Sequence, residues 1–110
     1  MNIRKSAAFE LDLAMQAAWY AERGGIELAE RFLGVVEATV GRLAQGERLG
    51  RRRFRGHPAL GDTLCANVNR PFHRQLLFYH ESGQELFLDR LLHGARDLPR
   101  RLVDQPGSEA

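Results

Sequence analysis

The sequence predicts an α+β domain in which an N-terminal antiparallel helical hairpin packs on a small, mainly antiparallel sheet of three to four strands. Two observations predict this class. Apolar residues recur at helical spacing over the first 44 residues, and the second half of the chain contains short apolar runs separated by turn residues. The order helix, helix and then strands is typical of α+β domains rather than of alternating βαβ units.

Two helices are expected before the sheet. Ser6 is a good N-cap for the first helix, and the residues at helical spacing after it are Phe9, Leu13, Ala17 and Tyr20 or Ala21. Gly24-Gly25 is expected to end this helix, and a second one is expected from about Ile26 to Ala44. A connection this short requires the two helices to be antiparallel neighbours. Ahead of them, Asn2 to Lys5 is expected to form at most a short edge strand.

The strands are expected in the second half of the chain. The runs Gln75 to His80 and Glu85 to Leu92 are apolar on both faces and are joined by Glu81-Ser82-Gly83-Gln84, which suits a β-hairpin at the centre of the sheet. Thr63 to Asn69 alternates between apolar and polar residues and is expected to be a third strand. A further short strand is expected at Arg51 to Arg55.

The length of the chain and its single cysteine restrict its class. A chain of 110 residues fits one domain, which we expect to extend over residues 1 to 102 and to be followed by a flexible tail at 103 to 110. Cys65 cannot form an intrachain disulfide, so a cytoplasmic protein is the simplest expectation. No apolar run approaches the length of about 20 residues that spans a bilayer, so no membrane partner is expected.

The arginines are unevenly distributed along the chain. Residues 48 to 74 contain a single acidic residue, Asp62, and seven arginines: Arg48, Arg51, Arg52, Arg53, Arg55, Arg70 and Arg74. Guanidinium groups pair well with phosphate and carboxylate, so this composition indicates a surface for nucleic acid or for an acidic protein segment. The alternative is a solvated loop that is merely basic, and no nucleic-acid-binding signature decides between them.

Candidate catalytic side chains lie mainly at the end of the predicted hairpin. Cleavage of RNA through the 2′-hydroxyl needs a base, an acid and a cation against the phosphate, and the side chains available are His73, Tyr79, Arg90, His93 and Arg96. In the structural alternative, which we favour, His93 and Arg96 hold the C-terminal turn and Tyr79 lies in the core. Strand alternation places Arg90 on the face of Leu88 and Leu92, opposite His93, so we favour no catalytic residue.

The remaining polar residues are expected to have structural roles. His57 and His80 have no further ligands at a recognisable spacing, so neither a metal nor another cofactor is expected. Cys65 is expected to be a buried apolar residue. Trp19 and Tyr20 are expected either in the core or in an exposed aromatic patch for a partner, and the core is favoured for at least one of them.

Several segments resemble the ParE branch of the RelE/ParE superfamily, the toxins of type II toxin-antitoxin systems that include plasmid stabilisation proteins. These segments are AAFELDLAMQAAWYAERGG, AERFLGVVEATVGRLAQGERLGRRR, RPFHRQLLFYH and RLLHGARDLPRRL, and the resemblance covers residues 2 to 102. Its most specific part is HGARDLP after an apolar strand. The resemblance implies a RelE/ParE-like fold, although family members usually have a longer first strand than residues 1 to 5 permit.

The resemblance also implies a function. ParE-type toxins are associated with growth arrest through binding and inhibition of DNA gyrase, and a cognate antitoxin neutralises them in a hetero-oligomer. The antitoxin is expected to lay a helix or strand across the toxin and to place acidic side chains against Arg51, Arg52, Arg53, Arg55 and Arg74.

Two alternatives to gyrase binding stay open. The first is a ribosome-dependent mRNA endonuclease of RelE type, in which Arg90, His93 and Arg96 would be catalytic. Such nucleases have a sheet rich in lysine and arginine, and many carry a tyrosine directly after the histidine. Here Lys5 is the only lysine and Gly94 follows His93, which counts against nuclease activity. The second alternative is an inactive module that still binds an antitoxin.

Overall fold

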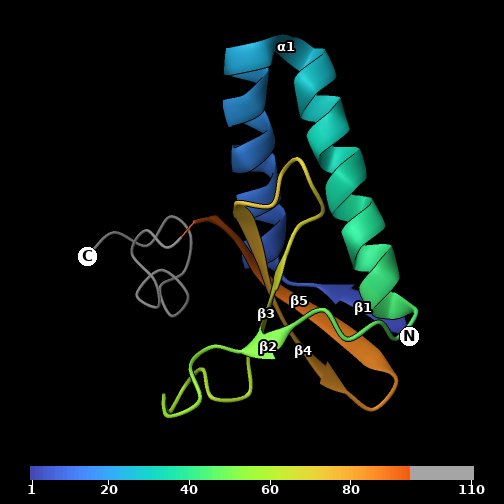
Figure 1. The fold of residues 1–110 in the computed structure, drawn as a ribbon, viewed down its shortest axis with the longest axis vertical. Coiled ribbons are helices and arrows are strands. Elements are labelled where there is room, and N and C mark those ends of the chain that lie inside the picture. The colour runs from blue at the N-terminus through green and yellow to red at the C-terminus, as the bar shows by residue number, and fades with distance from the viewer. Residues whose placement is uncertain (95–110) are drawn as a thin grey trace.

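The structure, a computed structural model, describes residues 1 to 94 and contains one long helix and a five-stranded sheet (Figure 1). The elements in chain order are β1 (Asn2–Lys5), α1 (Ala7–Ala44), β2 (Arg51–Arg52), β3 (Leu64–Asn67), β4 (Gln75–Ser82) and β5 (Glu85–His93). The strand order in the sheet is β1-β5-β4-β3-β2. Arg96 and the predicted tail at 103 to 110 lie outside the described residues.

The prediction of two separate helices is wrong, because one helix, α1, runs from Ala7 to Ala44 and changes direction at Gly25. Gly25 has φ of 81° and ψ of 175°, a backbone conformation that glycine adopts without a steric cost. A single residue therefore makes the turn, and no loop is needed. We call residues 7 to 24 the first arm and residues 26 to 44 the second arm; Figure 1 shows the chain folding back between them.

The predicted sheet of three to four mainly antiparallel strands is also wrong. The sheet has five strands and is mixed, because β1 pairs with β5 in parallel while the other neighbours are antiparallel. Backbone hydrogen bonds from Asn2 to Gln84 (2.8 Å) and from Ser6 to Leu88 (3.1 Å) tie the first residues of the chain to β5. The short edge strand expected at Asn2 to Lys5 is confirmed as β1, whose residues are all exposed, but its parallel pairing with β5 was not predicted.

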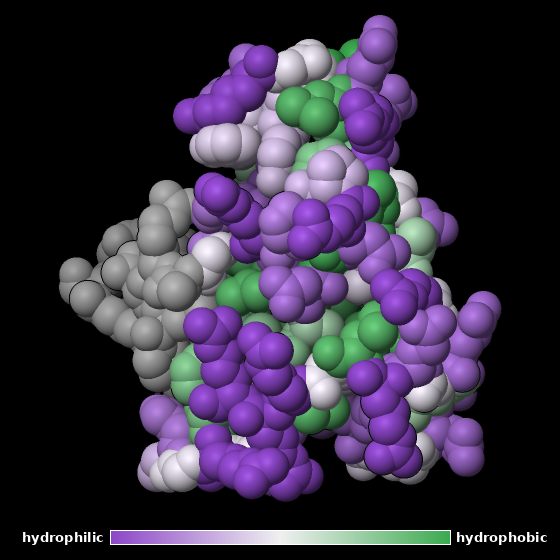
Figure 2. All heavy atoms as spheres, viewed as in Figure 1, coloured by the Kyte–Doolittle hydropathy of each residue, from purple (hydrophilic) through white to green (hydrophobic). Residues whose placement is uncertain are grey.

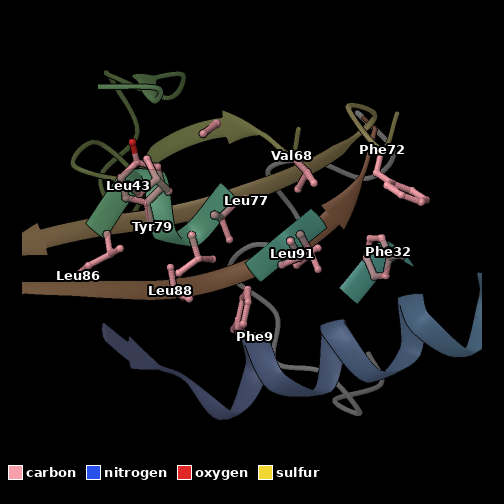
Figure 3. Close-up of a cluster of buried hydrophobic side chains, with 13 residues drawn as sticks. Phe9, Phe32, Leu43, Val68, Phe72, Leu77, Tyr79, Leu86, Leu88 and Leu91 are labelled. Carbon is pink, nitrogen blue, oxygen red and sulfur yellow. The ribbon is translucent and has the colours of Figure 1, made fainter. Parts of the chain in front are cut away.

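Apolar side chains form one large cluster between the sheet and α1. Its buried members are Phe9, Phe32, Val36, Val40, Leu43, Ala66, Val68, Phe72, Leu77, Tyr79, Leu86, Leu88 and Leu91. Figure 3 shows Phe9 pointing from the first arm toward β5, and Phe32 lying beside Phe72 with ring centroids 5.4 Å apart. This cluster fixes both arms relative to the strands.

A smaller cluster comprises Cys65, Leu76, Phe78 and Leu92, with Phe54 stacked on Phe78 at a centroid distance of 6.3 Å. The predicted burial of Cys65 is thereby confirmed, since only 5% of this residue is exposed. Because successive side chains of a strand point to opposite faces, Leu76 and Leu77 belong to different clusters and identify the two faces of the sheet.

A β-bulge in β5 changes the expected alternation. Tyr79 lies opposite Leu88 and Phe78 lies opposite Arg90, so Asp89 is the extra residue between them. As a result Leu88 belongs to the large cluster and Leu92 to the small one. The prediction that Arg90 shares one face with both leucines is therefore wrong.

Candidate functional site

Four arginines form a basic surface at the edge of the sheet. Arg51 and Arg52 make up β2, which pairs with Cys65 and Leu64 of β3, and Arg53 and Arg55 follow directly; all four are exposed. We call Arg51, Arg52, Arg53 and Arg55 the arginine surface. Figure 2 shows hydrophilic side chains gathered over the region where Figure 1 places β2 and the loop after it.

A close contact between Gly50 and Tyr79 fixes the start of the arginine surface. A Cβ atom on Gly50 would lie 2.1 Å from the Tyr79 hydroxyl, so only glycine permits this approach. Gly50 also contributes a backbone hydrogen bond to Tyr79, and burial raises the pKa of that hydroxyl. Tyr79 is 2% exposed and lies in the large cluster, so β2 is anchored directly to the core.

Arg74 does not belong to the arginine surface. It directly precedes β4 and is exposed, and its carbonyl accepts a 2.7 Å hydrogen bond from the Gly94 N–H. Arg51 lies level with Cys65 of β3 and, through it, with Phe78 of β4. Phe78 is four residues after Arg74, and β2 is two strands away from β4. With about 3.3 Å per residue and about 4.8 Å between strands, Arg74 and Arg51 are separated by about 16 Å.

Cys65 lies next to the arginine surface, and its thiol is buried. Burial raises its pKa, an effect that outweighs the opposing hydrogen bond and charge of Arg53. The thiolate is the reactive form of cysteine, so a raised pKa lowers its reactivity.

Arg90 forms a buried ion pair with Asp12 of the first arm. Its Nε donates to Asp12 Oδ2 at 2.7 Å and its Nη2 donates to Oδ1 at 3.0 Å, while the Leu91 N–H also donates to Oδ2 at 3.0 Å. Both residues are 5% exposed. The pair joins the first arm to β5 just beyond the bulge. In the nuclease alternative, the Arg90 guanidinium would have to act as a catalytic cation.

His93 and Arg96 are the other two residues that would be catalytic if the chain were a nuclease. His93 is half-buried at the end of β5, opposite Gln75, and Arg96 lies outside the described residues. Gln75 itself is buried and donates from Nε2 to Gln16 Oε1 at 3.0 Å and to the Tyr20 hydroxyl at 3.3 Å. The region under the first arm therefore contains a partly buried network of polar contacts.

Sequence reasoning missed this network. Asp12, Gln16 and Tyr20 recur every four residues and so form one stripe of the helix. The sequence did contain a signal for the burial of Asp12, because the nine residues after it carry no charged side chain. A helix segment without charged residues is typically covered by other parts of the protein.

His80 and Asp89 form a partly exposed pair on β4 and β5. His80 Nδ1 lies 2.8 Å from Asp89 Oδ2, and the His80 ring stacks on Phe87 with centroids 4.7 Å apart. Burial raises the pKa of Asp89, and the hydrogen bond and charge of His80 oppose this shift. Among residues 1 to 94, no group of three or more histidine, cysteine, aspartate or glutamate side chains is arranged to hold a metal ion.

An open groove of 520 Å³ lies between β1 and the two arms of α1. Its lining residues are mainly apolar: Ile3, Lys5, Phe9, Leu13, Leu33, Val36, Glu37, Val40 and Gly41. Ile3 and Leu33 are 42% and 39% exposed, so apolar surface is accessible along the groove. No local pattern in the sequence predicts the groove, because residues from three separate parts of the chain create it.

The groove is bordered by the outer edge of β1. β1 is the last strand of the sheet and pairs only with β5 within the described structure. The N–H groups of Asn2 and Ser6 point to β5. Because backbone groups alternate in direction along a strand, those of Ile3 and Lys5 point to the outer edge, where an added strand can pair with them. Within residues 1 to 94, no helix has the length and apolar character required to cross a membrane.

Comparison with solved structures finds a similar fold. A chain of the structure described as the chromosomal ParDE TA system from P. aeruginosa aligns with a TM-score of 0.69 and 18% sequence identity, over 86% of this chain and 96% of the other. No protein-family model matches the sequence, and no curated protein is significantly similar to it. The expected resemblance to the ParE branch is thus confirmed for the fold, which this chain shares with a chain of a ParDE system.

Proposed function

We propose that this chain is the toxin of a type II toxin-antitoxin system, that it inhibits DNA gyrase by binding, and that a cognate antitoxin neutralises it. The observation that carries the proposal is the apolar groove beside the outer edge of β1, in a chain with the fold of a ParDE component. Contiguous exposed apolar surface of this kind typically marks a site where another protein binds.

The groove suits an amphipathic segment of the antitoxin. A helix or strand can place apolar side chains against Leu33 and Val36 while Lys5 and Glu37 orient its polar groups. Acidic side chains of the same antitoxin would then contact the arginine surface. Arg74 lies about 16 Å from Arg51 by strand geometry, so a partner that contacts both must be elongated, as segments that fold on binding are.

The burial of Arg90 supports binding rather than RNA cleavage. A catalytic cation has to reach the phosphate on which negative charge develops. The Arg90 guanidinium is 5% exposed and is held by both oxygens of Asp12, an arrangement that suits a structural role. The nuclease alternative would therefore require the first arm to move away from β5.

Expression of the chain without an antitoxin tests the proposed activity. DNA and protein synthesis are followed separately by uptake of labelled precursors after induction. We expect DNA synthesis to stop first, with cleaved DNA accumulating, and the purified chain to inhibit supercoiling by gyrase. If protein synthesis stops first, the chain acts as an mRNA endonuclease, and if neither stops, it is an inactive antitoxin-binding module.

Two glutamate substitutions test whether the antitoxin occupies the groove. Leu33→Glu places a charge on the groove wall, and we expect antitoxin affinity to fall at least about tenfold, which corresponds to about 1.4 kcal/mol. Ile26→Glu is the matched control, since Ile26 is 68% exposed and lies next to the turn of α1, outside the groove. Equal affinities of the two variants, measured by calorimetry, would contradict this docking site.

The arginine surface is tested separately. Replacing Arg51, Arg52, Arg53 and Arg55 together with alanine should weaken antitoxin binding and make the remaining affinity less sensitive to salt, because screened charge attraction is lost. Arg74→Ala measures the contribution of the separate arginine. Unchanged affinity of the fourfold variant at moderate salt would show that the arginine surface does not contact the antitoxin.

A further inference from the structure

We propose that the first arm of α1 has a second contact surface, through which two copies of this chain associate around a two-fold axis. We call this surface the arm face, and it consists of Leu11, Ala14, Met15, Ala18 and Trp19. All five residues are exposed, and the three large ones are exposed by 43% (Leu11), 55% (Met15) and 43% (Trp19). The proposal does not depend on the proposed function.

The arm face is uncharged, which is unusual for the solvent side of a helix. No charged residue occurs from Leu13 to Ala21, and Asp12 just before them is buried against Arg90. Outward faces of amphipathic helices usually carry charged or polar side chains. The five residues lie three or four positions apart, so they form one continuous apolar stripe about 12 Å long.

The arm face is distinct from the groove. With about 100° of rotation per residue, Leu13 lies about 160° around the helix from Met15. Leu13 and Phe9 line the groove, whereas the stripe of Asp12, Gln16 and Tyr20 packs on the sheet. The first arm therefore has two separate apolar surfaces, and a partner on one leaves the other open.

The sizes of the side chains indicate a second copy as the partner. In an antiparallel arrangement of two first arms, Met15 lies against Ala14 of the partner subunit and Leu11 lies against Ala18 of the partner subunit. A single register thus places Leu11 and Met15 opposite alanines on both copies at once, while Trp19 lies opposite Glu10 of the partner subunit. Such self-complementarity is what a two-fold interface between identical chains requires.

The charges at the ends of the arm face fit the same register. Glu22 then lies beside Ala7 of the partner subunit, at the N-terminal end of its helix, where the helix dipole is positive. Trp19 is held in place before association, because the Arg23 guanidinium lies over its ring at 3.8 Å and Tyr20 packs against the ring edge at a centroid distance of 5.1 Å. A fixed side chain loses little conformational entropy on binding.

The size of the contact predicts a weak dimer. A helical strip from Ala7 to Glu22 is about 22 Å long and about 10 Å wide, which gives a footprint of about 200 Å² per copy. A stable interface buries about 800 Å² on each partner. The dimer should therefore form only at high protein concentration, and each copy keeps its groove accessible in it.

Analytical ultracentrifugation of the purified full chain tests the proposal. We expect the wild-type chain to shift from monomer toward dimer as its concentration rises. Met15→Glu should raise the dissociation constant at least tenfold, because it brings two carboxylates together near the two-fold axis. The matched control Leu33→Glu, which alters the groove, should dimerise like the wild type. Circular dichroism checks that both variants are folded.

Disulfide cross-linking tests the register. Cys65 is buried, so introduced cysteines react without competition from it. When Leu11→Cys and Ala18→Cys proteins are mixed and oxidised, the mixed disulfide should exceed both homotypic products. A chain that stays monomeric at every concentration, a dimer that Met15→Glu does not weaken, or a preference for homotypic disulfides would each overturn the proposal. So would a monomer whose antitoxin binding is weakened by Met15→Glu, since the arm face would then bind a different protein.

Discussion

The buried ion pair between Asp12 and Arg90 gives the sharpest prediction about stability. Asp12→Ala removes the carboxylate that holds two guanidinium nitrogens and also accepts the Leu91 N–H. Removing one partner of a buried ion pair typically costs about 3 to 5 kcal/mol. Domains of this size are stable by about 5 to 15 kcal/mol, so the variant should lose a large part of its stability and some of its folded population at physiological temperature.

Urea unfolding followed by far-ultraviolet circular dichroism measures the effect. The midpoint of the transition should fall strongly while its slope stays similar, because the folded state buries a similar surface. Glu10→Ala is the matched control, since Glu10 is an exposed carboxylate two residues earlier in the same arm, and its loss should cost no more than about 1 kcal/mol.

A double variant separates the ion pair from general damage to the helix. Asp12→Leu combined with Arg90→Met replaces both charges by apolar groups of similar size, so no charge remains in the buried site. Such replacements are often neutral, and we expect the double variant to be more stable than Asp12→Ala. If Asp12→Ala lies within about 1 kcal/mol of the wild type, the inferred role of this pair in fixing the first arm is refuted.

Three further substitutions test local features of the fold. Gly50→Ala forces a Cβ atom into the Tyr79 hydroxyl, and it should displace β2 and lower the melting temperature, which differential scanning calorimetry would detect. Ser6→Ala removes the cap that accepts the Phe9 N–H at 2.9 Å and should cost about 1 kcal/mol in urea unfolding; no loss would show that the cap is dispensable. Burial raises the pKa of Asp89 above its ordinary value of 3.8, so the folded state binds this proton more tightly than the unfolded state. The stabilising contribution of Asp89 is therefore fully present below about pH 4 and is lost as pH rises through the raised pKa. Asp89→Asn should gain stability relative to the wild type over that range. A difference in free energy of unfolding between the two proteins that stays constant with pH would contradict this.

The sequence alone determined the elements whose patterns are local. The apolar runs of β4 and β5 identified the central hairpin, and the turn at Gly83 follows from its sequence with φ of 61°. Helical periodicity identified the segment from Ser6 to Ala44, and Ser6 is the N-cap as predicted. These features depend on neighbouring residues in the chain, so local patterns are sufficient to predict them.

Tertiary structure alone decided the features that join distant segments. β1 is exposed throughout and pairs in parallel with β5, about 80 residues away in the chain, and no local pattern encodes such a pairing. The bulge at Asp89 reversed the predicted faces of β5, since one extra residue shifts every side chain after it. Asp12 became the partner of Arg90, and the groove formed where β1 meets both arms, because long-range packing and not periodicity brings these residues together.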